Sequence, residues 1–306
     1  MKNLIILFAS LGLLSCADKI DISNKIKNTD SQLAVDAFLN NLAEKQVVIL
    51  SGTQPFYDNT SQKLLSGAVV TVTNTKTGSI YTFSEVEQGK FVSSITGDVM
   101  LQVGTEYALN INYKNETFVA ISKVNRVVPV DSLFFKTSKT IAGKDIANKY
   151  DAEFWAKDSL GTGDRYWVRF YRNGVRNMQP EIINISYDGS LGTSTVADAG
   201  VFIFPLRAAI NESGQDKQYV IGENVKVEIY SISVEAAFFL SSISQLSQQS
   251  SGGAFGALFS QPPYNLPTNV ANTNENGTKP VGYFSTSAVT FLDATVPFAA
   301  SGKQIK

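Results

Sequence analysis

Apolar and polar side chains alternate at every second residue between positions 33 and 126, and no other pattern in the chain restricts its fold as strongly. Successive side chains of a strand point to opposite faces, so this alternation predicts strands with one buried face. The segments 68–73 and 79–83 are joined by the polar residues 74–78, which predicts a hairpin. Further strands are expected at 90–94, 106–113 and 117–123, with a tight turn at Asn115. Short strands separated by polar turns predict an antiparallel sandwich of the immunoglobulin or transthyretin type.

Pro129 interrupts this pattern, because proline disfavours both helix and central strand. We place a domain boundary after residue 127. Beyond it, strands are expected at 132–136, 150–156, 165–172 and 225–230, and the Asn173-Gly174 turn ends the third of them. One helix is expected at 234–249, where one stripe at helical spacing contains Ala236, Phe239, Leu240, Ile243 and Leu246. The stripe predicts that the helix packs on a sheet, with a membrane or partner role as the lesser alternative.

These elements predict a mainly β protein with two antiparallel β-sandwich-like domains, the second carrying one amphipathic helix. The N-terminal domain, immunoglobulin- or transthyretin-like, is expected at residues 31–127, and the β-rich C-terminal domain with helix 234–249 at residues 128–306. A chain of 306 residues exceeds the usual size of a single domain. Hydrophobic residues make up 43% of it and charged residues 17%, which is typical of a globular protein with a packed core.

The first residues have the layout of a bacterial lipoprotein signal peptide. Lys2 precedes an apolar run at 4–14, which is shorter than the roughly 20 residues that cross a membrane as a helix. The run ends in Leu13-Leu14-Ser15-Cys16, which matches the lipobox, where the thiol accepts a diacylglyceryl group before cleavage. Cys16 is the only cysteine, so a disulfide within the monomer is excluded. We expect removal of residues 1–15 and lipidation of Cys16; the alternative is an ordinary signal peptide with an incidental cysteine.

Lipidation of Cys16 would anchor the protein on a membrane. The diacylglyceryl group and a further acyl chain on the amino group of Cys16 would give three acyl chains. Three chains hold a protein far more firmly than a single chain, which binds a membrane only marginally. Residues 16–30 are rich in Asp, Lys, Asn and Ser and are expected to form a flexible tether. Asp18 and Asp21 follow Cys16 closely. Acidic residues there direct some bacterial lipoproteins to the cell surface, although a solvated tether would look the same.

The absence of histidine narrows the chemistry of the chain more than any motif does. It excludes a Ser-His-Asp triad and zinc sites built on imidazole, and lipidation of the one cysteine removes thiol catalysis. Carboxylate, lysine or tyrosine chemistry and oxygen-ligand cation binding remain. Among the carboxylates, Asp151, Glu153, Asp158 and Asp164 lie near one another in sequence. Strand alternation places only Asp151 and Glu153 on one face, and nothing indicates the paired geometry of a glycoside hydrolase. We therefore predict no catalytic residues, no metal site and no cofactor. A formal net charge of −1 gives no basic excess for nucleic-acid binding.

Two groups of residues are candidates for contact with a ligand or partner. Trp167, Arg169 and Tyr171 share one face of the strand 165–172, and an exposed row of this kind could stack on sugars or peptides. The favoured alternative is that both faces of the strand are covered inside a two-layer fold. Phe255 and Phe259 lie in a Gly/Ser-rich loop, from which they could insert into a partner protein or fold back over the core.

Gly282 precedes two aromatic residues in a segment with strand character. A glycine within a strand marks a close approach of another backbone or a bend at a packed corner. We expect Gly282-Tyr283-Phe284 to have a structural role ahead of contact with a ligand.

A series of motifs runs in order along nearly the whole mature chain. They are the lipobox, Gly67-Ala68-Val69-Val70-Thr71-Val72, Gly104-Thr105-Glu106-Tyr107-Ala108-Leu109, Val128-Pro129-Val130-Asp131-Ser132-Leu133, Gly163-Asp164-Arg165-Tyr166-Trp167, Pro262-Pro263-Tyr264-Asn265-Leu266-Pro267-Thr268-Asn269 and Val281-Gly282-Tyr283-Phe284-Ser285. In this order they resemble the lipoproteins grouped as domain-of-unknown-function family 4249, which are common in Bacteroidetes-type bacteria. The resemblance implies a lipoprotein anchored on the outer membrane, at the cell surface or on the periplasmic face. Such lipoproteins often accompany TonB-dependent receptors bearing a carboxypeptidase-regulatory-like domain. It brings no catalytic residues.

Three functions from different classes follow from these observations. The first is a non-catalytic accessory or binding module that works with a TonB-dependent receptor in nutrient uptake. The second is a structural or adhesive envelope lipoprotein, for which two β-domains on a lipid stalk are equally suited. The third, which the sequence favours least, is a hydrolase that uses carboxylates.

Overall fold

The computed structural model of the chain describes residues 31–54, 62–180, 182–191, 198–212, 214, 217–251, 266–297 and 303–305. The predicted signal peptide, Cys16, the tether, Phe255 and Phe259 lie outside these residues. Strands make up most of the regular structure, so the prediction of a mainly β protein is confirmed. None of the helices in the described part of the chain has the length and apolarity that a membrane crossing requires.

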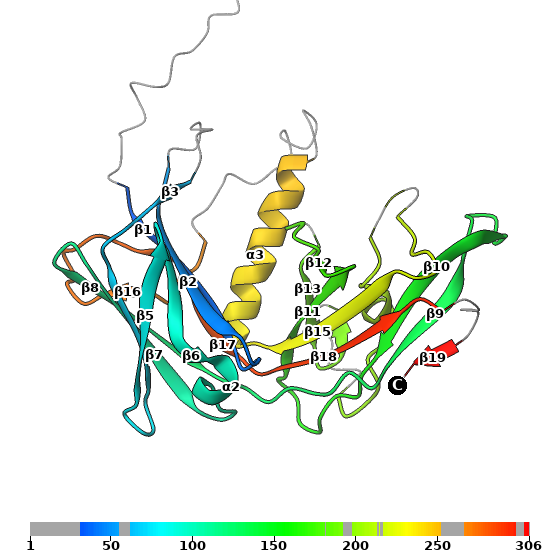
Figure 1. The fold of residues 1–306 in the computed structure, drawn as a ribbon, viewed down its shortest axis with the longest axis horizontal. Coiled ribbons are helices and arrows are strands. Elements are labelled where there is room, and N and C mark those ends of the chain that lie inside the picture. The colour runs from blue at the N-terminus through cyan, green and yellow to red at the C-terminus, as the bar shows by residue number, and fades with distance from the viewer. Residues whose placement is uncertain are drawn as a thin grey trace, which may run out of the picture.

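The first sheet contains ten strands in the order β16-β8-β7-β4-β5-β6-β2-β1-β17, with β3 paired to β2 (Figure 1). Their bounds are β1 Leu33–Asn40, β2 Lys45–Gly52, β3 Lys63–Leu64, β4 Val69–Asn74, β5 Ile80–Glu87, β6 Lys90–Thr96, β7 Glu106–Tyr113, β8 Glu116–Lys123, β16 Ala271–Asn272 and β17 Val281–Ser287. The short helix α2, Gly97–Met100, follows β6. The predicted hairpin is formed by β4 and β5, and Asn115 occupies the turn between β7 and β8 with a φ of 63°.

This sheet curls so that β17 comes back against β8. The main-chain N–H of Thr286 in β17 donates to Oγ of Ser122 in β8 at 2.8 Å. The side-chain amide of Asn269 bridges the same two strands, donating to the carbonyl oxygen of Phe284 at 2.8 Å and to that of Ile121 at 3.3 Å. The largest enclosed side chains include Phe91, Tyr107, Phe118 and Phe284. We expected a sandwich, and the structure has one continuous curled sheet. Both arrangements bury one face of each strand, so the alternation of apolar and polar residues does not distinguish them.

The second half of the chain contributes two further sheets. One has the order β14-β13-β11-β15-β18, with β12 paired to β11, and the other has the order β10-β9-β19. The bounds are β9 Ser132–Lys139, β10 Asp145–Trp155, β11 Arg165–Arg172, β12 Val175–Arg176, β13 Asn184–Tyr187, β14 Ser190–Leu191, the 3-10 turn η2 Leu206–Ala208, β15 Asn224–Ser231, β18 Val289–Thr295 and β19 Lys303–Ile305. Tyr166, Val168 and Phe170 of β11 share a core with Phe154 of β10 and with Phe202, so the two sheets pack face to face.

Strand β17 joins the two parts of the molecule. It pairs in parallel with β1 in the first sheet, and after Ala288 the chain continues as β18 beside β15. Ser231 closes this junction, because its Oγ accepts the main-chain N–H of Ala288 at 3.0 Å and donates to the carbonyl oxygen of Asn125 at 2.8 Å. Strands β16 and β17 thus lie in the first sheet, although we placed their residues in the second domain. Alternation shows which face of a strand is buried but not which strand lies next to it.

Gly282 is required where β17 meets β1. Its φ of 92° lies in the left-handed region that favours glycine. A Cβ at this position would overlap the main-chain carbonyl oxygen of Val35. The predicted close approach of another backbone at Gly282 is therefore confirmed.

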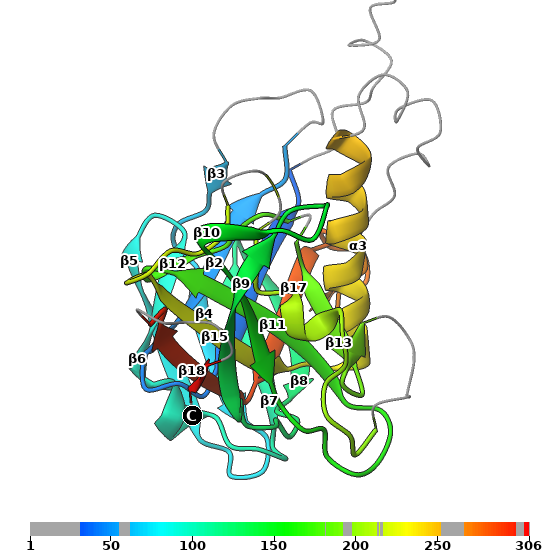
Figure 2. The ribbon, with the colours of Figure 1, turned by 90° about the vertical axis from the view of Figure 1, so that its right-hand side faces the viewer.

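Helix α3, Val234–Ser251, packs over the junction between the two parts. In Figure 1 it stands between the first sheet and the sheet that contains β11, and in Figure 2 it runs along one side of both. Its contacts are with β11, β13 and β17, so the prediction that it packs on a sheet is confirmed. The cluster that it forms with these strands contains Ala236, Ala237, Phe239, Leu240, Trp167, Tyr230 and Tyr283.

Candidate functional site

A cavity of about 500 Å³ lies between the two parts of the molecule, beside α3. Strands β1 and β2 form one wall, β11 and the segment that begins with β12 form another, and α3 contributes side chains as well. Most of the lining is apolar and includes Phe38, Val47, Ile49, Phe239, Leu240 and Ile243. Met178, Gln179 and Pro180 line the cavity and are exposed, so it opens to the surface beside them. Its volume is in the range of pockets that bind small molecules.

Arg169 borders this cavity from β11 and lies over two aromatic rings. Its guanidinium carbon is 3.6 Å from the ring centroid of Trp167 and 3.9 Å from that of Tyr230. Trp167 and Arg169 share a face of β11, and Tyr230 in β15 is directly opposite Trp167, so the sheet itself brings the three together. Burial lowers the pKa of Arg169 from its usual value, but a guanidinium titrates so high that it keeps its charge. The faces of the two rings attract this charge.

Arg176 in β12 borders the cavity beside the same indole. Its guanidinium carbon lies 5.2 Å from the ring centroid of Trp167. The Nε atoms of Arg169 and Arg176 are buried without a hydrogen-bond partner, as are those of Arg165 and Arg207. Unlike Arg165 and Arg207, neither Arg169 nor Arg176 forms an ion pair with a residue that the structure describes. Both side chains are half-buried, and cations held away from water are normally paired, so these two call for an explanation.

The other arginines of the protein are paired with carboxylates. The chain has six arginines, and each of the remaining four has a carboxylate within 4.0 Å. Arg126 binds Asp164 through Nε at 3.0 Å and Nη2 at 2.6 Å, and Arg172 binds Glu223 through Nε at 2.9 Å and Nη2 at 2.6 Å. The two arginines that have no carboxylate within 4.0 Å in the described ranges are those that border the cavity.

Asp36 in β1 contributes a carboxylate to the facing wall of the cavity. It is open to the cavity and forms no ion pair with any residue in the described ranges. Burial among protein atoms raises the pKa of this carboxyl, while the positive charges of Arg169 and Arg176 act in the opposite direction. The cavity therefore has charges of both signs on different walls.

Glu228 in β15 is directly opposite Arg169 in the register, but its carboxylate is already engaged. It accepts hydrogen bonds from the hydroxyls of Tyr171 at 2.8 Å and Tyr230 at 3.0 Å, and it pairs with Lys226 at 2.6 Å. Burial, followed by the hydrogen bond to Glu228, raises the pKa of Tyr171 to about 12. The carboxylate of Glu228 is thus bound by these three neighbours and forms no ion pair with Arg169.

The structure places two of the three predicted contact residues of β11 at the cavity. Trp167 and Arg169 line it, whereas Tyr171 does not, and its hydroxyl donates to Glu228. Trp167 is only 8% exposed and the opposite face of β11 is buried, so both faces of this strand are covered. Sequence analysis missed Asp36 and Arg176, because no local pattern shows that these two side chains border one cavity. Phe255 and Phe259 lie outside the described residues.

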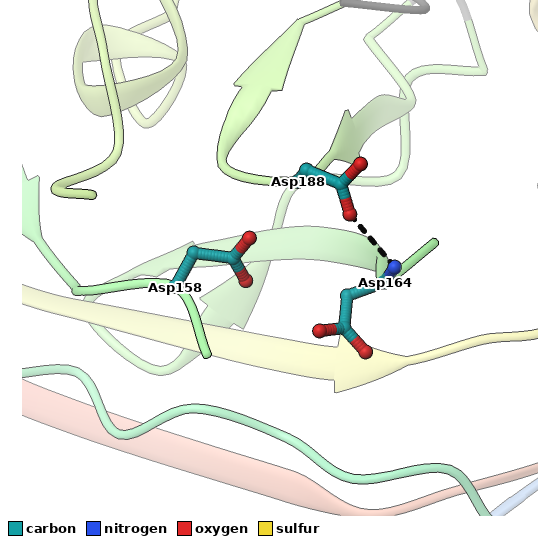
Figure 3. Close-up of side chains that lie close together, drawn as sticks. All are labelled: Asp158, Asp164 and Asp188. Atoms are coloured by element: carbon teal, nitrogen blue, oxygen red, sulfur yellow. Dashed lines mark hydrogen bonds between the residues drawn. The ribbon is translucent and has the colours of Figure 1, made fainter. Parts of the chain in front are cut away.

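A second group of charged side chains lies at the start of β11. Carboxylate oxygens of Asp158, Asp164 and Asp188 come within 4.8 Å of one another (Figure 3). One oxygen of Asp188 accepts the main-chain N–H groups of Gly163 and Asp164, each at 2.8 Å. The hydroxyl of Tyr166 donates to Asp158 at 2.7 Å. Carboxylates are the ligands that hard cations such as Ca²⁺ and Mg²⁺ prefer, so this group has the donor set of a cation site.

These carboxylates also have a clear structural use. Asp188 is fully buried and fastens the residues that lead into β11, while Arg126 neutralises Asp164. Burial raises the pKa of Asp158, against the opposing effect of the hydrogen bond from Tyr166. The sequence analysis named Asp158 and Asp164 but missed Asp188.

The other two carboxylates considered for catalysis are not part of this group. Glu153 in β10 pairs with Lys136 and lies 4.0 Å from Arg207. Asp151 is likewise absent from the set of neighbouring carboxylates among the described residues. The structure therefore does not bring the four predicted carboxylates into one site.

Comparison with known proteins gives one positive finding. A family model described as a domain of unknown function (DUF4249) matches residues 19–291. The matched range contains the walls of the cavity, the three aspartates and α3. A search of curated proteins finds no match to the chain.

Proposed function

The chain belongs to the DUF4249 family, and we propose that it is a lipid-anchored, non-catalytic binding module of the outer membrane that holds its ligand in the cavity between β1 and β11. We further propose that it acts as an accessory to a TonB-dependent receptor in nutrient uptake. Resemblance to lipoproteins that accompany such receptors supports this second part.

The cavity is the observation that carries the proposed binding role. It is built from strands of both parts of the molecule and from α3, and it combines an apolar lining with Asp36, Arg169 and Arg176. A few charged groups on an apolar wall are typical of pockets that orient a small ligand. A structural or adhesive lipoprotein would not need a pocket of this kind.

The lipobox at Leu13-Leu14-Ser15-Cys16 supports the anchor. A lipid on Cys16, followed by the polar segment 16–30, would hold the folded part of the chain close to the membrane surface. This position would present the cavity to molecules that arrive at, or leave, a receptor in the same membrane.

The test is purification of the intact protein from its own outer membrane after mild cross-linking, with mass spectrometry of the proteins recovered with it. We expect a TonB-dependent receptor in stoichiometric amount from the wild-type chain. The matched control is Cys16→Ser, which removes the lipid acceptor and leaves the residues that form the cavity unchanged.

The control should lose both the acyl modification and the receptor. Recovery of the wild-type protein without a receptor would contradict the accessory role. If deletion of the gene then weakened adhesion or envelope integrity but not growth on any nutrient, the structural alternative would replace it. Wild-type protein that carried no lipid would contradict the anchor.

A further inference from the structure

We infer that the cavity binds a small amphipathic carboxylate, whose anionic group lies between Arg169 and Arg176 and whose apolar body lies against α3 and β1. This inference names the ligand class of the proposed binding module and in that sense rests on the proposed function. Four observations carry it: the state of the two arginines, the way in which they are held, the position of the nearby carboxylates and the apolar lining.

The first observation is that Arg169 and Arg176 are the two arginines of the chain that have no carboxylate within ion-pair distance among the described residues. Their Nε atoms are buried without a hydrogen-bond acceptor, as are those of Arg165 and Arg207, so the missing anion is what sets Arg169 and Arg176 apart. A cation held away from water without an anion is unfavourable. An anionic ligand in the cavity would supply that partner to both guanidiniums.

The second observation is that the rings of Trp167 and Tyr230 hold Arg169 in place through its flat face. Stacking uses the faces of a guanidinium and leaves its N–H groups, which point outward in the plane, free to donate. Arg176 adds a second guanidinium beside the same indole. Planar N–H donors fixed in advance match the two oxygens of a carboxylate and lose little entropy when it binds.

The third observation is the position of the carboxylates that act on the two arginines. Glu228 already accepts hydrogen bonds from Tyr171 and Tyr230 and pairs with Lys226, and Asp36 lies on the facing wall. Neither of these two carboxylates forms an ion pair with Arg169 or Arg176, so both guanidiniums remain available to a ligand carboxylate. Because Asp36 belongs to the wall formed by β1, it would repel the carboxylate and keep it beside β11 and β12.

The fourth observation is the apolar remainder of the cavity. Phe38 in β1 and Phe239, Leu240 and Ile243 in α3 supply most of the surface that a ligand body would touch beyond the arginines. Burying apolar ligand surface against such side chains is favourable roughly in proportion to its area. A hydrophilic anion such as acetate would forgo this contribution, and so we infer an amphipathic ligand.

The experiment is isothermal titration calorimetry of residues 17–306, which contain every residue that the structure describes. The probe is octanoate, compared with 1-octanol, octylammonium and acetate, which share its apolar chain or its charge but not both. We expect octanoate to bind with one-to-one stoichiometry and about tenfold or more tightly than 1-octanol or acetate. Octylammonium should not bind.

Arg169→Gln and Arg176→Gln should each weaken octanoate binding by about tenfold and leave binding of 1-octanol unchanged, since only the charged contact is lost. Arg126→Gln is the matched control, because this arginine already has Asp164 as its partner, and it should not change octanoate binding. Circular dichroism shows whether each variant folds. If Arg169→Gln does not fold, Arg169→Lys provides the test, since it keeps the charge, loses the planar donors and should bind octanoate with intermediate affinity.

Equal affinity for octanoate and 1-octanol, or unchanged octanoate binding in both arginine variants, would overturn the anionic ligand class while leaving the cavity as a binding site. Absence of binding by every probe would overturn the inference itself. Neither result depends on whether a receptor is recovered from the membrane, so failure of this inference and failure of the proposed receptor partnership are distinguished.

Discussion

Two charged groups near β11 differ in their partners. Just before the strand, Arg126 binds Asp164, and one oxygen of Asp188 accepts two main-chain N–H groups, although its other oxygen is buried without a hydrogen-bond partner. On the strand itself, Arg169 has aromatic neighbours but no carboxylate within ion-pair distance among the described residues, and it borders an open cavity. Carboxylates bound within the fold stabilise it, whereas a cation without an anion beside a cavity indicates a ligand. Substitutions should therefore affect stability at the first group and binding at the second.

The largest effect is expected where the wall of the cavity is built. Gly282→Ala places a Cβ against the carbonyl oxygen of Val35 at a φ of 92°, so it should destabilise the protein by about 3 kcal/mol. Because the β1–β17 pair supports the cavity and not the aspartates, octanoate binding should weaken in the protein that remains folded. Urea unfolding and calorimetry measure the two effects. Stability equal to that of the wild type would show that β1 and β17 do not approach as closely as described.

A smaller loss of stability is expected at the aspartate group. Asp188→Ala removes the acceptor of the main-chain N–H groups of Gly163 and Asp164, which would cost about 2 kcal/mol in the free energy of unfolding. Octanoate affinity should not change, since Asp188 does not line the cavity. An increase in stability would instead mean that repulsion among the three carboxylates outweighs their hydrogen bonds, and would reverse this side of the comparison.

The opposite sign is expected at Arg169. Arg169→Met removes a buried charge that lacks an anionic partner and keeps an apolar side chain over Trp167 and Tyr230, so it should raise the free energy of unfolding by about 1 kcal/mol. The same variant should bind octanoate about tenfold more weakly. Thermal unfolding without ligand checks the gain in stability. A clear loss would show that stacking on the rings already compensates the charge, and the arginine would then need no ligand.

The smallest effect concerns the pH dependence of anion binding. Burial raises the pKa of Asp36, so this carboxylate takes up a proton at a higher pH than an ordinary aspartate. Protonation removes a negative charge that repels the ligand, and affinity for an anion should rise as pH falls through the pKa of Asp36. Octanesulfonate, which stays ionised, should show an increase of about threefold, whereas Asp36→Asn should bind tightly at every pH in the series. An affinity that falls with decreasing pH would contradict this role for Asp36.

The sequence predicts where the strands and the helix lie better than it predicts which strands pair with one another. The predicted strands 106–113 and 165–172 correspond to β7 and β11, and the predicted helix 234–249 lies within α3. Their periodic patterns are local properties of the chain, and these can be read without a structure. The parallel pairing of β1 with β17 joins segments from opposite ends of the chain, and alternation carries no information about such a partner.

The same limit explains what was found of the candidate site. Trp167 and Arg169 were identified because two-residue spacing places them on one face of a strand. Asp36 and Arg176 were not, since they come from two other strands that only the tertiary structure brings to the cavity, and neither was Tyr230, whose ring lies against Arg169. For Arg169 we favoured a covered face of the strand over an exposed row, and it borders a cavity because α3 and β1 cover that side of β11.

The most direct test of the central claim is the NMR signal of each arginine Nε–H, recorded before and after addition of octanoate. The account predicts that the signals of Arg169 and Arg176 shift as their guanidiniums gain an anion, while those of Arg126 and Arg172, which already bind Asp164 and Glu223, stay in place. If the signals of Arg169 and Arg176 did not change when the protein was saturated with octanoate, the claim that these two arginines bind the anionic group of a ligand would be contradicted.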